Sequence, residues 1–157
     1  MTEAKFKDAM ARIPTNVSIL GSFEADRIRA CTISSLVSVD IVDPTVMFVL
    51  KKSSATLANI ESTKNFSVNV LNSNQSSLSE KYSNKREEIE DLNDSISWSN
   101  HVNSVPVIKD AHLIFFCKMV SALEIENSTI VFARVMEIWT GDSKNPLVYF
   151  DRKYFGL

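Results

Sequence analysis

The stretch AHLIFFCKMVSALEIENSTIVFARVMEIWTG, residues 111–141, consists of two long runs rich in β-branched and aromatic residues. Such residues favour the pleated, half-buried surface of a sheet. The runs cover residues 111–126 and 128–141, and Glu126 and Asn127 between them suit a tight turn. The sequence therefore predicts two long strands joined by a hairpin turn.

Shorter segments on either side of this hairpin extend the same pattern. Strands are expected at 15–23, 28–39, 45–50, 65–71 and 146–150. Short helices are expected at 3–12, 51–63 and 74–83, and a mostly irregular connection at 84–104. Most connections are too short for crossover helices. The prediction is a mainly β chain in which about seven antiparallel strands close a small barrel.

Length and charge narrow the class of protein. The 157 residues predict a single domain over 1–157. A net charge of −2, from 17 basic and 19 acidic side chains, argues against nucleic-acid binding, which needs a basic face. No apolar run approaches the ~18 residues of a membrane span. Cys31 and Cys117 are predicted to be buried free thiols, and the cytoplasm is the expected compartment.

Several cofactor motifs are absent from the sequence. With three glycines, the chain contains neither the GxGxxG motif of dinucleotide-binding folds nor a P-loop. The two histidines lack metal-ligand spacing with Cys, Asp or Glu, so no metal site is predicted.

The first candidate site is KKSSAT, residues 51–56, where a strand gives way to a helix. The first amides of a helix lack internal partners and favour an anion. Ser53, Ser54 and Thr56 add hydroxyl donors, and Lys51 or Lys52 adds positive charge. This composition is typical of a phosphate cradle. An ordinary helix cap with solvated lysines remains the alternative.

The second candidate is ACTISSLVSVDIVDP, residues 30–44, a strand-like segment with many hydroxyls. On an extended strand Thr32, Ser34, Leu36 and Ser38 share one face. Such a mixed wall suits a flat heteroaromatic ligand with polar edges, and a solvent-facing row of serines is the alternative.

The third candidate is LVYFDRKYFGL, residues 147–157. Tyr149, Arg152 and Tyr154 place aromatic and cationic groups near the end of the chain. They could stack on a ring or hold the segment against a partner subunit. Packing of surface aromatics on the barrel is the simpler alternative.

The order of these segments resembles the flavin reductase-like family, the small reductase components of two-component flavin monooxygenases such as the 4-hydroxyphenylacetate type. Five segments carry the resemblance: FKDAMARIPTNVSIL (6–20), TISSLVSVDIVDP (32–44), LKKSSATLANI (50–60), NFSVNVL (65–71) and LVYFDRKYFGL (147–157). Together they run nearly from end to end of the chain.

The resemblance implies a six- to seven-stranded antiparallel split β-barrel with short helices, which forms a homodimer and binds FMN, or FAD, near the subunit interface. The family's pattern assigns the isoalloxazine edge and ribityl chain to Thr32, Ser34, Ser35 and Ser38. It assigns the phosphate to Ser53, Ser54 and Thr56 with Lys51 or Lys52. Further cofactor-binding candidates are Asn69, Lys81, Tyr149 and Arg152.

One departure from the family pattern concerns the second long run of the hairpin. The family commonly has Gly-Asp-His before this strand, and its His lies against the flavin and nicotinamide. Here the corresponding residues are Glu126, Asn127 and Ser128.

The implied activity is NAD(P)H-dependent flavin reduction, with NADH or NADPH as co-substrate and an oxygenase component as a possible recipient of reduced flavin. A flavin-binding carrier or electron-relay protein is the alternative, which Ser128 favours. A ferric reductase is a third hypothesis.

Overall fold

The computed structural model describes residues 1–83, 89–91, 97–100 and 105–157. Its helices there are α1 (Glu3–Ala11), α2 (Ala55–Thr63) and α3 (Ser76–Ser83). The main sheet contains β2 (Ser18–Glu24), β3 (Arg27–Ile33), β4 (Val37–Asp40), β5 (Thr45–Lys51), β6 (Asn65–Val70), β7 (Ile89–Asp91), β10 (Leu113–Ile125) and β11 (Ser128–Thr140). Two smaller sheets contain β1 (Thr15–Asn16), β8 (Trp98–Asn100), β9 (Pro106–Ile108), β12 (Leu147–Phe150) and β13 (Lys153–Gly156).

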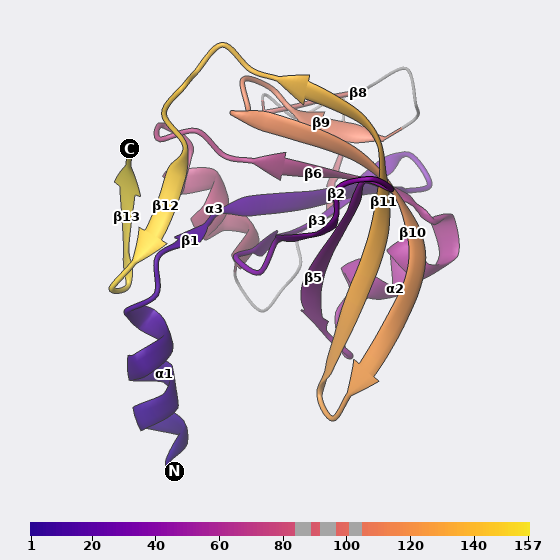
Figure 1. The fold of residues 1–157 in the computed structure, drawn as a ribbon. Coiled ribbons are helices and arrows are strands. Elements are labelled where there is room, and N and C mark those ends of the chain that lie inside the picture. Colours follow the sequence, from indigo (N-terminus) through magenta and orange to yellow (C-terminus); the bar gives the residue numbers. More distant parts are fainter. Residues whose placement is uncertain (84–88, 92–96, 101–104) are drawn as a thin grey trace.

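The main sheet is antiparallel, in the order β4-β5-β11-β10-β6-β2-β3-β7. Its centre is the predicted hairpin, in which Ile125 pairs with Ser128. The sheet curls, because β3 and β5 contact each other although four strands lie between them in the order. This is the predicted split barrel, and Figure 1 shows the β10–β11 hairpin running past its body.

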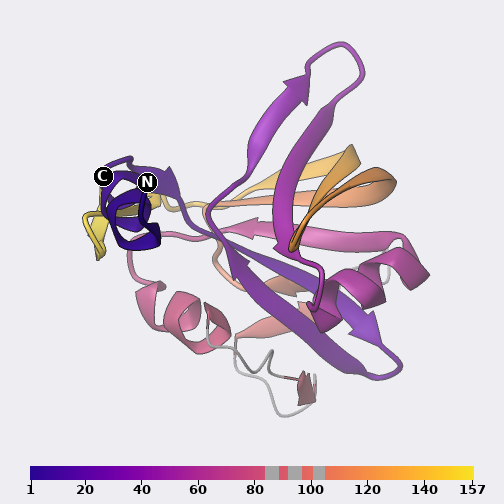
Figure 2. The same ribbon diagram turned by 90° about the horizontal axis from the view of Figure 1, so that it is seen from below.

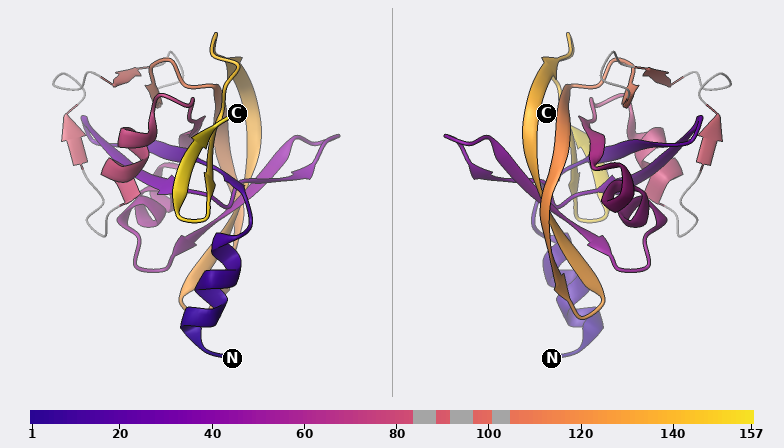
Figure 3. Two further views of the ribbon diagram at one scale, coloured as in Figure 1. Left: turned by 90° about the vertical axis from the view of Figure 1, so that its left-hand side faces the viewer. Right: turned by 90° about the vertical axis from the view of Figure 1, so that its right-hand side faces the viewer.

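Two arms project beyond the barrel. The β10–β11 ladder is irregular between Phe116 and Cys117 and again between Met119 and Ser121. Such bulges bend a strand and increase its twist. The far half of this hairpin extends from the body in Figure 3, and β4 with the loop to β5 forms a second arm in Figure 2.

The interior of the barrel is a cluster of apolar side chains from β2, β3, β5, β6, β10 and β11. Phe48 and Phe66 pack edge to face at its centre, with ring centroids 5.6 Å apart. Leu57 and Ile60 of α2 complete the cluster, which fixes α2 against the sheet. Burial of these aromatic and aliphatic groups is the main favourable term in folding.

A second apolar cluster lies on the opposite face, under α3 and the β8–β9 ribbon. Its largest side chain is Trp98, whose indole Nε1 donates a hydrogen bond to the Tyr82 hydroxyl over 2.9 Å. Gly21 admits this ring, because a Cβ there would lie 2.6 Å from Trp98 Cζ3. The connection at 84–104, predicted to be mostly irregular, contains the two short strands β7 and β8. Residues 84–88, 92–96 and 101–104 lie outside the described residues.

The predicted single strand at 28–39 is also corrected. It breaks into β3 and β4, and Ser34–Leu36 form a bend between them. Polar contacts to neighbouring strands stabilise the bend: Asn16 Nδ2 donates to the Leu36 carbonyl over 3.1 Å, and the Val49 amide donates to Ser35 Oγ over 2.9 Å. The alternation of faces expected across this segment does not persist beyond Ile33.

The C-terminal segment forms a small sheet in which β12 pairs with both β1 and β13. The strand β13 was not predicted. The β12–β13 turn contacts α1, because Arg152 forms an ion pair with Asp8 and the Asp151 amide donates to the Ala11 carbonyl. The predicted helix at 3–12 is confirmed as α1, which has no buried residue and extends away from the barrel in Figure 3.

Both cysteines are buried and free, as predicted. Among the described residues, none of the helices has the length and apolar character needed to cross a bilayer.

Candidate functional site

A pocket of about 610 Å³ lies between β3 and β5, at the beginning of α2. Its walls combine Arg29, Cys31 and Thr32 from β3 with Val49, Leu50 and Lys51 from β5. Its other lining residues are Ser53, Ser54 and Ala55 before and in α2, and Tyr82 and Ser83 from α3. The two segments that the sequence singled out, around Thr32 and Ser53–Ser54, therefore meet at one site.

The pocket exists because the barrel is open at this place. β4 pairs with β5 only opposite residues 45–47, so the following residues of β5 have no strand on that side. There the Val49 amide donates to Ser35 Oγ instead. β3 approaches β5 without pairing with it, and the space between the two strands stays available for a ligand.

The start of α2 supplies the polar end of the pocket. Ser54 is the N-cap, and its Oγ accepts a hydrogen bond from the Leu57 amide over 3.2 Å. The Ser54 amide donates to the Lys51 carbonyl over 2.9 Å, which closes the turn between strand and helix. The helix dipole adds partial positive charge at this end.

The two lysines before α2 have different surroundings. Lys52 forms a 2.9 Å ion pair with Glu124, and its amide donates to the Asn127 carbonyl over 3.1 Å. Lys51 lines the pocket. The choice between the two lysines that the sequence left open therefore favours Lys51 as the pocket cation.

Thr32 connects the pocket wall to α3. Its hydroxyl donates to the Ser79 carbonyl over 2.8 Å, and Ser79 Oγ in turn lies 2.9 Å from the Tyr154 hydroxyl. These contacts hold α3 beside β3, which brings Tyr82 and Ser83 to the pocket. Cys31, Val49 and Leu50 add apolar surface of the kind that a flat ring packs against.

The remaining serines of the second candidate segment do not line the pocket. Ser34 is exposed in the bend after β3, and Ser38 is exposed on β4, where it pairs with Val46. Ser35 borders the site only through its hydrogen bond with the Val49 amide. Of the four residues that the resemblance assigns to the ring and ribityl chain, only Thr32 lines the pocket. The assignment of the three serines stays a prediction.

Two predicted cofactor-binding residues, Asn69 and Thr56, are buried in the protein interior and do not line the pocket. Asn69 is fully buried: its Nδ2 donates to the Ile19 carbonyl over 3.0 Å, and its Oδ1 accepts from the Ile108 amide over 2.9 Å. It therefore joins three strands. Thr56 is also fully buried, because it lies on the face of α2 that packs against the barrel.

Three further candidates, Lys81, Tyr149 and Arg152, are not among the residues that line the pocket. Lys81 Nζ lies 5.1 Å from the centre of the Tyr82 ring. Tyr149 packs on Tyr154 with ring centroids 5.1 Å apart, and Arg152 forms its ion pair with Asp8 of α1. Tyr149 and Tyr154 also pack against the second apolar cluster, as the alternative of surface aromatics on the barrel expects.

The structure adds pocket residues that sequence reasoning missed. Arg29 lies three residues before Thr32, and Ala55 directly follows Ser54, so proximity in sequence could have suggested both. No comparable signal existed for Tyr82 and Ser83, because tertiary packing brings α3 to β3. No cluster of metal-binding side chains occurs in the described part of the chain.

The fold and the pocket define a class of protein. The model of the flavin reductase like domain matches residues 10–157, and the chain belongs to this family. It is 27% identical to "FMN reductase (NADH) RutF" of Stutzerimonas stutzeri (strain A1501) over 152 residues, which cover 97% of this chain and 87% of that relative.

Solved structures share the whole fold. One is BorF, the flavin reductase component of a bacterial two-component tryptophan halogenase, with a TM-score of 0.91, 20% identity and coverage of 99% of this chain and 98% of that one. Another is the NADH:FAD oxidoreductase SgcE6 of Streptomyces globisporus in complex with NAD and FAD fragments, with a TM-score of 0.87, 18% identity and coverage of 97% and 90%.

Proposed function

We propose that this protein is an NADH-dependent flavin reductase that uses FMN. One observation carries the proposal: the pocket joins the Thr32 wall of β3 to the serine-rich start of α2. The names of the curated relatives, which are FMN reductases that use NADH, support the choice of FMN and NADH over FAD and NADPH.

The residues of the pocket fit the parts of a phosphorylated flavin. The phosphate would lie against Ser53 and Ser54, where hydroxyls, helix amides and Lys51 all favour an anion. The flat ring would contact the apolar surface of Cys31, Val49 and Leu50. Bound FMN supplies the ring that accepts a hydride from the nicotinamide.

The contribution of the chain to this reaction is binding and orientation. Hydride transfer between two stacked rings needs no side chain that gains or loses a proton. Thr32 would lie at the polar edge of the ring, with its orientation fixed by the Ser79 carbonyl. Ser128 in place of the family's usual His therefore affects the docking of nicotinamide and leaves hydride transfer possible.

A homodimer is part of the proposal. The two arms carry exposed apolar residues: Ile41 is 89% exposed, Val42 93% and Val120 59%. Met136, which is 65% exposed, lies on β11 nearer the body of the barrel. Exposed apolar surface of this kind marks interaction sites. A V42D/M136D double variant should convert a dimer of the wild type into a monomer in light-scattering chromatography. A wild-type protein that is monomeric in solution would contradict the proposed homodimer.

An oxygenase component remains the proposed recipient of reduced flavin. The named neighbours support this, because one is the flavin reductase component of a two-component halogenase and another that of styrene monooxygenase. The free thiols of Cys31 and Cys117 support a reducing compartment such as the cytoplasm.

The decisive experiment titrates the purified protein with FMN and then follows NADH consumption at 340 nm. The expected result is FMN binding at micromolar concentration and NADH oxidation well above the rate with FMN alone. FMN binding without NADH or NADPH oxidation would favour the carrier or electron-relay alternative. Activity that requires chelated Fe(III) would favour a ferric reductase, and failure to bind FMN and FAD would overturn the proposal.

A further inference from the structure

The pocket contains a second cation, Arg29, that no sequence motif assigned. Arg29 lies on β3, on the side of the pocket opposite Lys51 of β5, and the start of α2 completes the same pocket. Only 12% of its side chain is exposed, whereas Lys51 is an exposed residue. A charge that has lost most of its water gains more from an anionic partner than a solvated one does.

One carboxylate fixes the orientation of Arg29. Its Nε and Nη2 both donate to Glu24 Oε2, the former over 3.0 Å. A guanidinium carries five N–H donors. Among the described residues, Glu24 is the only partner of this side chain, which leaves three N–H groups for a ligand. Glu24 itself is 47% exposed.

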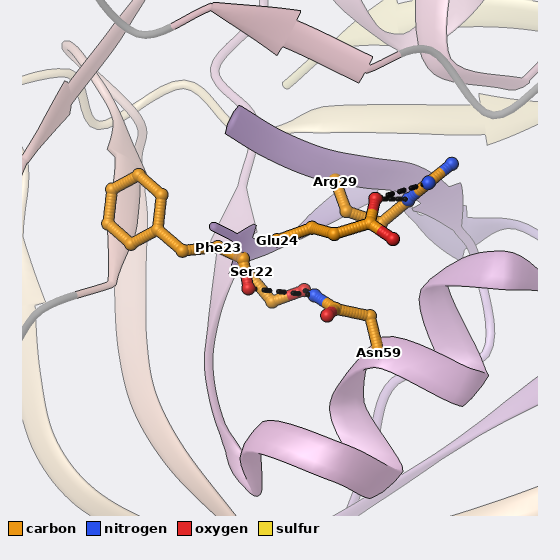
Figure 4. Close-up of polar contacts among 5 residues, drawn as sticks. All are labelled: Ser22, Phe23, Glu24, Arg29 and Asn59. Atoms are coloured by element: carbon orange, nitrogen blue, oxygen red, sulfur yellow. Dashed lines mark hydrogen bonds and ion pairs between the residues drawn. The ribbon is translucent and has the colours of Figure 1, made fainter. Parts of the chain in front are cut away.

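Hydrogen bonds join α2 to the β2–β3 hairpin, which carries Glu24 and Arg29 (Figure 4). Asn59, in the middle of α2, donates from Nδ2 to Ser22 Oγ over 2.7 Å and to the Phe23 carbonyl over 3.1 Å. Glu24 follows directly on β2. The helix whose start forms the phosphate cradle is thus connected to the strand end that orients Arg29, and the relative position of cradle and guanidinium is set before a ligand binds.

We propose that Arg29, oriented by Glu24, is the largely buried cation that binds the flavin phosphate and gives the pocket its preference for phosphorylated flavin over riboflavin. The inference rests on the proposed flavin site. A planar guanidinium with free donors matches phosphate oxygens in a way that the point charge of Lys51 does not. Glu24 is a positioning residue, because it acts through Arg29.

The test compares two ligands that differ only in the phosphate. Dissociation constants for FMN and riboflavin are measured from the change in flavin fluorescence on binding. R29Q should weaken FMN about 10- to 100-fold, the size of a lost charge-assisted hydrogen bond, and leave riboflavin within about twofold. R27Q is the matched control, since Arg27 is exposed on the same strand and does not line the pocket.

The outcomes separate the inference from the function on which it depends. Equal weakening of FMN and riboflavin in R29Q, or an unchanged affinity for FMN, would overturn the role of Arg29 while the flavin site stands. A wild type that binds neither flavin would overturn the site itself. Thermal unfolding shows whether R29Q is folded; if it is not, R29K serves as the test and should still weaken FMN selectively.

The positioning role of Glu24 has its own readout. E24A should weaken FMN and not riboflavin, because the guanidinium loses its orientation. E24Q keeps an acceptor for Arg29 and should restore FMN affinity to that of the wild type or better, since it also removes a negative charge near the phosphate. An E24Q variant as weak as E24A would contradict the role.

Discussion

Ser128 on β11 pairs directly with Lys51 on β5, so the residue that the resemblance matches to the family's usual histidine lies beside a pocket cation. The turn before Ser128 is hydrogen-bonded to the residue that follows Lys51, because the Asn127 carbonyl accepts from the Lys52 amide. The tip of the long hairpin therefore borders the end of the pocket at which Lys51 lies. A substitution at Ser128 changes the rim of the site without removing any of its lining.

Histidine at this position should improve the use of NADH. In S128H, the imidazole would provide a flat surface and a hydrogen-bond donor at the rim, so we expect a lower KM for NADH and an unchanged Kd for FMN. Steady-state kinetics at 340 nm measure the effect.

S128A is the matched control. Because hydride transfer needs no proton donor here, kcat should stay within about twofold of the wild type. Loss of turnover in S128A would contradict this expectation and show that the serine hydroxyl takes part in the reaction.

Two substitutions at Ser54 should separate its capping role from its role toward an anion. Aspartate caps a helix about as well as serine, so S54D should keep the thermal stability of the wild type but repel the phosphate and lose FMN binding. S54A removes the cap and should lower the free energy of unfolding by about 1 kcal/mol. Calorimetry and FMN titration provide the two readouts, and an S54D variant that binds FMN normally would place the phosphate elsewhere.

Asn69 should matter for stability and not for flavin affinity. N69A would leave the Ile108 amide and the Ile19 carbonyl without their side-chain partner in the interior, so a loss of about 2–4 kcal/mol is expected. Urea unfolding measures the loss. A folded N69A variant with normal stability but a weakened affinity for FMN would restore the original assignment of Asn69 to the cofactor.

The Cys117 thiol should remain protonated and unreactive in the folded protein. Burial raises its pKa from 9.0 to about 12, because the thiolate would lose its water. The unfolded thiol ionises near pH 9, so its contribution to stability is complete below that pH and is lost as pH rises toward 12.

The measurement compares the pH dependence of unfolding in the wild type and in C117A. Between pH 9 and 11 the free energy of unfolding of the wild type should fall more steeply than that of C117A, by at most about 1.4 kcal/mol per pH unit. Comparing slopes removes the constant loss from the missing sulfur. Parallel slopes in the two proteins would show that the thiol is not protected.

Much of the fold could be predicted because local sequence carries it. Alternating apolar residues predicted β5, β6 and the β10–β11 hairpin. The serines at 53 and 54 marked the start of α2, and the structure identifies Ser54 as its N-cap. The prediction of one continuous strand at 28–39 is wrong for a physical reason. Serine hydroxyls such as those of Ser34 and Ser35 can hydrogen-bond to other backbone groups, and Ser35 Oγ accepts from the Val49 amide. The strand β13 was missed because its pairing with β12 depends on a turn through positive φ at Asp151 and Arg152.

The sequence alone determined the antiparallel architecture, the helix start with its serines and the likeness to one family, because periodicity, capping and motif order are local properties of a chain. Only the tertiary structure decided which side chains share the pocket. Arg29, Tyr82 and Lys51 lie far apart along the chain and meet there because the sheet curls until β3 approaches β5 and α3 packs beside β3. The same packing turned Asn69 and Thr56 toward the interior, since the sheet and α2 each have one face to bury.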